Sequence, residues 1–114
     1  MPKQKRGVTQ AEFRRLALSM PETEEKSHMK HPDFRVRGKI FATLAYPDKN
    51  FGMVKLTHAE QSTFIDAEPE AFKPCSGTWG QRGATHVRLA AVSKKILEDA
   101  LLRAWRNVSG QGVR

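Results

Sequence analysis

The hydrophobic and polar positions of this chain change period several times, and each change marks an expected helix or strand. Near the start, Thr9 and Glu12 have the spacing of a capping box, and Val8 and Phe13 are placed to form a hydrophobic staple. This pattern predicts a helix that begins at Gln10. Its apolar positions, spaced for one helical face, are Phe13, Leu16, Ala17 and Met20.

The segment after this helix is polar. Pro21 ends the helix, and residues 22–31 contain too few apolar side chains to pack as a regular element. We therefore expect a long loop there.

A two-residue period begins at Phe34. Phe34 and Val36 fall on one side of the expected strand and Arg35 and Arg37 on the other, ahead of a turn signal at residues 38–39. An apolar second strand over residues 40–46, a turn over 47–50 and a third strand over 51–56 follow. The pattern predicts three consecutive antiparallel strands.

A second capping box, Thr57 with Glu60, opens another expected helix, with Phe64 and Ile65 in its core and an end near Pro69. Ala71 and Phe72 are expected to anchor its exit. The glycine-containing segment 73–84 leads into an alternating strand over 85–89, and a final helix follows Ser93 and stops at Gly110. The buried positions predicted for that helix are Ile96, Leu97, Ala100, Leu101, Ala104, Trp105 and Val108.

The predicted fold class is α+β, in the order α-β-β-β-α-β(β)-α, with helices packed on one face of an antiparallel sheet and the other face open to solvent. A chain of 114 residues suits one domain, expected over residues 9–110 behind a flexible basic tail at residues 1–8.

Composition adds a preference for anionic partners. The chain has 20 Lys and Arg against 12 Asp and Glu, and its net charge of +8 suggests nucleic acid or an acidic membrane surface. Cys75 is the single cysteine, which excludes an internal disulfide and a cysteine-cluster zinc site and fits a cytoplasmic location. No apolar run is long enough to span a bilayer, so no membrane partner is expected. His28 and His31 lack further ligands, and we expect neither a metal nor a cofactor.

Several basic and aromatic residues are candidates for nucleic-acid binding on the open sheet face. Trp79 or Tyr46 would stack on an exposed base, Arg82 would make a forked contact with a phosphate, and single strands suit such a face better than a duplex groove. Two alternatives stay open: a charged strand face that only prevents aggregation, and a Trp79 ring buried in the core, which is the favoured interpretation of that ring. The candidate residues are Arg35, Arg37, Lys39, Lys55, Trp79, Arg82, His86 and Arg88.

Four segments in the right order resemble the MmcQ/YjbR family. They are residues 13–26, residues 31–36, residues 38–44, and Trp79-Gly80 with residues 85–89. The resemblance implies a small helix-and-antiparallel-sheet fold akin to the type III secretion chaperones. Members are described as DNA-binding-like proteins, and the family carries no accepted catalytic residues.

Together these features favour a non-enzymatic nucleic-acid-binding protein of low sequence specificity, with DNA or RNA as its partner. The alternative is a protein-interaction or chaperone-like module, with a protein partner or a homodimer. An enzyme acting on a small acidic ligand near Arg82 and His86 has the weakest support, since no acid, base and nucleophile converge in the sequence.

Overall fold

The computed structural model describes residues 7–28, 30–45 and 48–110, which form a six-stranded antiparallel sheet and four helices. The strands are β1 (Thr23–His28), β2 (His31–Val36), β3 (Lys39–Leu44), β4 (Phe51–Lys55), β5 (Phe72–Pro74) and β6 (Ala84–Arg88). The helices are α1 (Gln10–Leu18), α2 (His58–Ala67), α3 (Gly77–Gln81) and α4 (Lys94–Ser109). The strand order across the sheet is β1-β2-β3-β4-β6-β5, and the predicted α+β fold class is confirmed.

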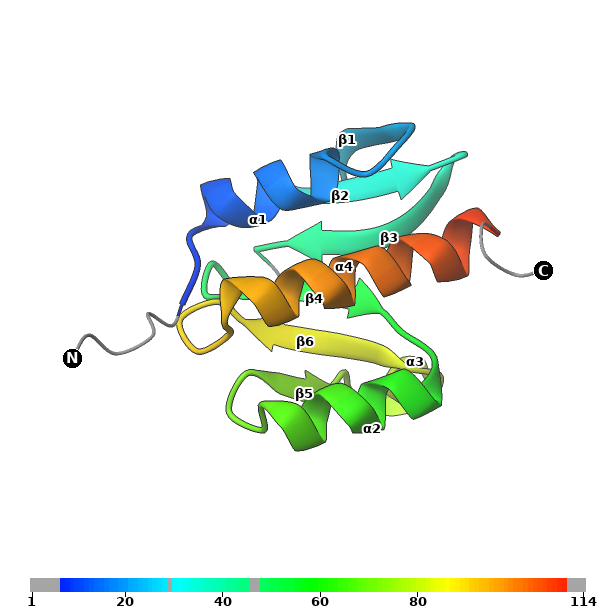
Figure 1. The fold of residues 1–114 in the computed structure, drawn as a ribbon. Helices are drawn as coiled ribbons and strands as arrows, with labels where there is room; N and C mark the ends of the chain where they lie inside the picture. Colours follow the sequence, from blue (N-terminus) through cyan, green and yellow to red (C-terminus); the bar gives the residue numbers. More distant parts are fainter. Residues whose placement is uncertain (1–6, 29, 46–47, 111–114) are drawn as a thin grey trace.

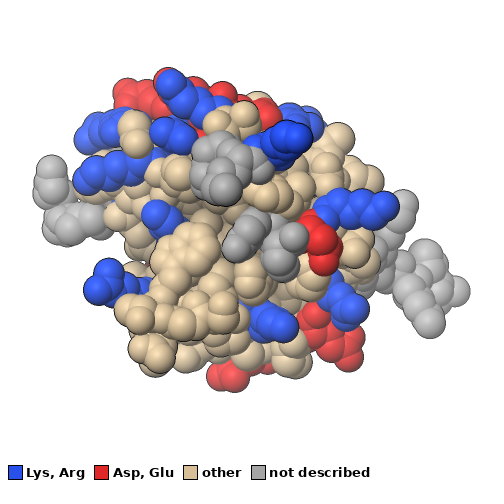
Figure 2. All heavy atoms as spheres, turned by 180° about the vertical axis from the view of Figure 1, so that it is seen from behind, with Lys and Arg blue, Asp and Glu red and all other residues tan. Residues whose placement is uncertain are grey.

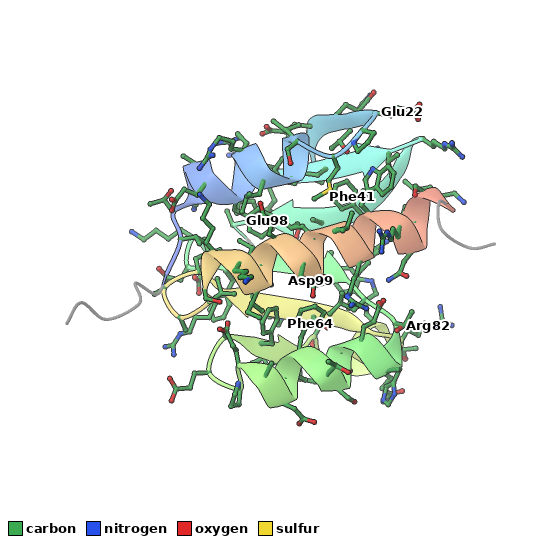
Figure 3. All side chains as sticks on the ribbon, viewed as in Figure 1. Glu22, Phe41, Phe64, Arg82, Glu98 and Asp99 are labelled. Carbon is green, nitrogen blue, oxygen red and sulfur yellow. The ribbon has the colours of Figure 1, made fainter. Side chains whose placement is uncertain are left out.

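Three helices lie on one side of the sheet (Figure 1). α4 crosses β3 and β4, α1 lies over β2, and α2 lies beside β5. The apolar stripe of α4 predicted from the sequence is the part of that helix turned inward, with Leu97 and Leu101 fully buried. Phe64 of α2 lies between α2 and α4 (Figure 3) and packs its ring 5.4 Å from that of Phe72. The core therefore occupies the space between these helices and one sheet face.

Both predicted capping boxes are present. The hydroxyl of Thr9 accepts from the Glu12 amide at 3.0 Å, and the Glu12 carboxylate accepts from the Thr9 amide at 2.9 Å. Thr57 and Glu60 make the same exchange at the start of α2. Gly110 ends α4 in the left-handed conformation, with φ of 80°.

Residues 23–28 form a strand, so the loop expected over residues 22–31 is wrong. β1 is an edge strand that pairs with β2 along its whole length, from Thr23 opposite Val36 to His28 opposite His31. Its residues 24–27 are exposed. Backbone hydrogen bonds to β2 hold an edge strand without an apolar face, and charged side chains on such an edge hinder pairing with other chains.

The glycine-containing segment 73–84 also holds more structure than its sequence suggests. It contains most of β5 and the whole of the short helix α3, which Figure 1 shows near the beginning of β6. Gly80 permits this arrangement, because a Cβ atom there would lie 1.6 Å from the carbonyl oxygen of Cys75. The backbones of α3 and of the segment that precedes it are therefore in direct contact.

The predicted basic tail over residues 1–8 meets the domain at its last two positions. The amide of Gly7 donates to the carbonyl of Val92, and that of Val8 donates to the carbonyl of Leu89, both at 2.8 Å. Val8 also joins the core as the expected staple residue. Residues 1–6 lie outside the described part of the chain, as does Tyr46. No helix among the described residues is long and apolar enough to cross a membrane.

Candidate nucleic-acid interface

The sheet face opposite α1, α2 and α4 presents the alternate residues of the central strands. Val54 and Val87 point into the main core, so their neighbours Met53 and His86, which lie opposite each other across β4 and β6, occupy the other face. Met53 belongs to a separate small cluster of buried residues on this side. Figure 2 views the molecule from this side and shows separate Lys and Arg side chains scattered among uncharged residues, together with several Asp and Glu side chains.

Four hollows follow one another among the described residues. Two lie over this face and share a wall, and the other two lie where residues of α4 also line them. The first has a volume of about 390 Å³ and is lined by residues of β4, β5, α3 and β6. The second, of about 230 Å³, shares Phe51, Lys73 and His86 with it and extends to Arg88.

The other two hollows continue from Trp79 in the opposite direction. The third, of about 470 Å³, contains Trp79, Arg82 and Lys55. The fourth, of about 460 Å³, shares Lys55 with the third and extends to Lys39 and Arg35. We call the four together the hollow band. The predicted site residues that line it are Arg35, Lys39, Lys55, Trp79, Arg82, His86 and Arg88.

Trp79 lies in the middle of the hollow band, and its side chain is 43% exposed. The interpretation of this ring as a buried core residue is therefore wrong. Gly80 packs α3 directly against the backbone of Cys75. The ring of Trp79, the residue before Gly80, lies on the outside of this contact. Arg82 follows at the end of α3 and is exposed at the end of the molecule where α2 begins (Figure 3).

The two arginines expected side by side on β2 have separate positions. Arg35 lies on the helix-free face and makes a forked contact with the buried carboxylate of Asp33, at 2.7 and 3.1 Å. This contact raises the pKa of Arg35 and opposes part of its charge. Arg37 instead lies in the turn between β2 and β3, with φ of 55°, and donates to the carbonyl of Ser109 at 3.2 Å. Arg37 therefore ties this turn to the end of α4 and does not line the hollow band.

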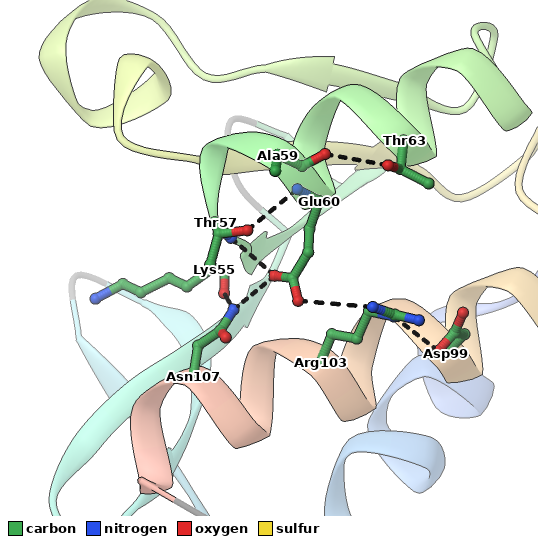
Figure 4. A network of polar contacts seen from close by, with 8 residues as sticks. All are labelled: Lys55, Thr57, Ala59, Glu60, Thr63, Asp99, Arg103 and Asn107. Carbon is green, nitrogen blue, oxygen red and sulfur yellow. Dashed lines mark hydrogen bonds and ion pairs between the residues drawn. The ribbon is translucent and has the colours of Figure 1, made fainter. Parts of the chain in front are cut away.

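Lys55 connects the hollow band to a polar network between α2 and α4 (Figure 4). Asn107 of α4 donates to the carbonyl of Lys55 at 3.1 Å and to the carboxylate of Glu60 at 2.9 Å. The guanidinium of Arg103 lies 3.8 Å from the same carboxylate. Burial would raise the pKa of Glu60, but the hydrogen bonds from Asn107 and Thr57 lower it overall. The network fixes the backbone that presents the Lys55 side chain.

Comparison with protein families identifies the chain. The family model described as YjbR matches residues 18–107. The chain belongs to the YjbR family. Among solved structures, the chain resembles the crystal structure of Deinococcus radiodurans protein DR2400, which has a DUF419 domain. The TM-score is 0.78 at 16% identity, over 96% of this chain and 85% of that one. No curated protein matches the YjbR protein described here.

The histidine of the hollow band in this YjbR protein is partly enclosed. The ring of His86 meets that of Phe51 edge-on, with 5.9 Å between ring centres. Burial lowers the pKa of His86, and the nearby ammonium group of Lys73 lowers it further. His86 is therefore uncharged at neutral pH. Lys55 likewise has a pKa lowered by burial.

Phe51 and Lys73 belong to the site but were absent from the residues expected from the sequence. Lys73 lies opposite His86 in the pairing of β5 with β6. β5 is only three residues long, so the segment gives no alternating pattern by which a strand is recognised. The sequence places Phe51 in the third expected strand but does not show which face of the sheet its side chain occupies. The register of β4 with β6 places it on the helix-free face.

Cys75 and the histidines offer little support for a catalytic or metal site. Burial raises the pKa of the Cys75 thiol to about 11, so this thiol is protonated at neutral pH. Among the described residues, no group of three His, Cys, Asp or Glu side chains is placed to hold a metal ion. The side chain of His28 lies outside the described part of the structure.

Proposed function

We propose that this YjbR protein binds single-stranded nucleic acid through the hollow band, without catalysing a reaction and with low sequence specificity. The observation that carries the proposal is the exposed Trp79 ring, which borders two hollows whose walls include Arg82, Lys55 and Lys73. Stacking of one base on an aromatic side chain contributes about 1–3 kcal/mol to binding, and flanking cations attract the phosphates.

The geometry favours a single strand over a duplex. Paired bases present only their edges, in grooves that admit a helix or a β-ribbon. An aromatic ring set in a hollow of a sheet face requires the flat side of an unpaired base. Contacts from lysine and arginine to phosphates carry no direct sequence information, which accounts for the low specificity proposed.

The proposal of a non-enzymatic role is supported by the state of the two groups best suited to catalysis. A cysteine nucleophile requires a thiolate, usually produced by a nearby base. The raised pKa of Cys75 works against the thiolate, and no hydrogen bond among the described residues joins Cys75 to His86. Binding alone therefore fits Cys75 better than nucleophilic chemistry.

Anisotropy titrations with a labelled thymine oligonucleotide over a salt series test the proposal. Replacing Lys39, Lys73 and Arg82 with alanine removes three exposed cations from the hollow band. The slope of log affinity against log salt should fall by about 2, since each lost phosphate contact on a single strand lowers it by about 0.7.

The matched control removes three exposed cations from α4, on the opposite side of the sheet, by replacing Lys94, Lys95 and Arg106 with alanine. Both variants have the same net charge, reduced from +8 by three. The control should keep the slope of the unmodified protein. Equal slopes for the two variants would show that only net charge matters, and absence of binding at low salt would refute the proposed function.

A further inference from the structure

The first hollow combines aromatic walls with a small number of polar groups. Its lining includes Trp79, Phe51 and Pro74 as flat or apolar surfaces, and His86 and Lys73 as polar ones. Its volume of about 390 Å³ lies within the range of about 300–1,000 Å³ typical of small-ligand pockets. A hollow of this kind suits a planar, partly polar group such as a nucleobase.

The two ring nitrogens of His86 differ in their surroundings. Nδ1 is buried and has no hydrogen-bond partner among the described residues. Because a buried N–H without an acceptor is strongly unfavourable, the single proton of the neutral ring belongs on Nε2. His86 lines the hollow, so Nε2–H is the donor available to a molecule inside it.

We propose that the hollow between Trp79 and Phe51 holds one unpaired base of the bound strand, and that Nε2–H of His86 donates to a carbonyl oxygen of that base. This inference rests on the proposed function and names the ligand group that the site recognises. Thymine, uracil, guanine and cytosine carry a ring carbonyl, whereas adenine carries none. The site therefore favours carbonyl-bearing bases over adenine.

The second hollow adjoins the first and adds a further cation beside it. It shares Phe51, Lys73 and His86 with the first hollow and has Arg88 at its far side. Residues common to two adjacent hollows form the wall between them. The exposed ammonium of Lys73 on this wall is placed to meet the phosphate that follows the bound base.

The test uses oligonucleotides of abasic sites that carry one central thymine, one central adenine or no base. The three have the same number of phosphates, so differences in affinity report the base alone. The unmodified protein should bind the thymine oligonucleotide about ten-fold more tightly than the fully abasic one. Trp79→Ala should remove this difference while leaving the affinity for the abasic oligonucleotide unchanged.

His86 variants test the hydrogen bond separately. His86→Phe keeps an aromatic ring without a donor and should bring thymine and adenine affinities to within a factor of two, from an expected preference of about three- to ten-fold. His86→Gln restores an N–H donor and should recover part of the preference for thymine. Thermal unfolding of each variant shows whether the fold is retained.

The outcomes separate this inference from the proposed function. Equal binding of the thymine and abasic oligonucleotides would overturn the base site while nucleic-acid binding stands. Binding of free thymidine monophosphate as tightly as the thymine oligonucleotide would overturn the assignment to a strand. Failure to bind any of the three at low salt would refute the proposed function itself.

Discussion

The side-chain amide of buried Gln61 donates to the backbone carbonyl of Gly80 at 3.0 Å, joining α2 to the residue that follows Trp79. The same nitrogen lies 3.1 Å from the carbonyl of Ala84 and 3.2 Å from the hydroxyl of Thr85. One side chain therefore links α2 with α3, which presents the exposed ring, and with the start of β6 that follows it. The position of Trp79 depends on a contact far from it in the sequence.

Replacing Gln61 with methionine should destabilise the protein by about 1–3 kcal/mol, because buried acceptors lose their donor. The matched control is Gln10→Met, which removes an exposed amide that donates to the carbonyl of Lys49 at 2.9 Å, and which should change stability by less than about 1 kcal/mol. Urea unfolding measures both. Equal losses for the two variants would contradict the role assigned to Gln61.

Gly80→Ala should be among the most damaging single substitutions in this chain. Its Cβ would lie 1.6 Å from the carbonyl oxygen of Cys75, and a displacement of backbone is the only relief. We expect a loss of more than about 4 kcal/mol, or an unfolded protein. Gly77→Ala is the control: it has open space and a φ of 72°, and should lose only about 1–2 kcal/mol through backbone strain. Similar melting temperatures for the two variants would contradict this packing.

Arg35 and Arg82 should have different roles, Arg35 in the stability of the fold and Arg82 in binding of the oligonucleotide. Removing Arg35 takes the forked partner from the buried Asp33 carboxylate, so Arg35→Ala should lower the stability of the fold measurably. The loss should be smaller than for a wholly buried ion pair, since the Arg35 side chain is 26% exposed. Arg82→Ala should leave stability unchanged within about 0.5 kcal/mol and weaken oligonucleotide binding. Unfolding and anisotropy titrations of both variants check this, and the reverse pattern would contradict it.

The stability of the protein should fall in mild acid through His86. The pKa of His86 is lower in the folded chain than its ordinary value of 6.5, so the unfolded chain takes up the proton first as pH falls. The contribution of His86 to the free energy of unfolding is complete above about pH 6.5, and it is lost as pH falls through the lowered pKa of His86 in the folded chain. His86→Gln should flatten the dependence of stability on pH below about pH 6.5. A slope unchanged by His86→Gln would show that other groups cause it.

The sequence was sufficient for the elements whose signals are local. The capping boxes at Thr9 and Thr57 depend on residues three positions apart, and the apolar stripe of α4 repeats over a long helix, so each could be recognised without knowledge of the rest of the fold. β1 could not, because an edge strand with exposed polar side chains is specified by its pairing with β2 rather than by a pattern of its own.

The candidate site was predictable in composition but not in detail. Trp79 and the basic residues could be selected by type, whereas the outward position of the Trp79 ring follows from the contact of Gly80 with Cys75. The position of Lys73 opposite His86 likewise depends on the register of β5 with β6. These relationships lie between segments, where sequence periodicity carries no information.

The fluorescence of Trp79 tests the central claim most directly. The chain has two tryptophans, and replacing the largely buried Trp105 with phenylalanine leaves Trp79 as the single emitter. Titration of this variant with a thymine oligonucleotide should quench the emission saturably, with the same midpoint as the anisotropy titration, because a base stacks on the ring. Binding detected by anisotropy with no change in Trp79 emission would contradict a nucleic-acid site centred on Trp79.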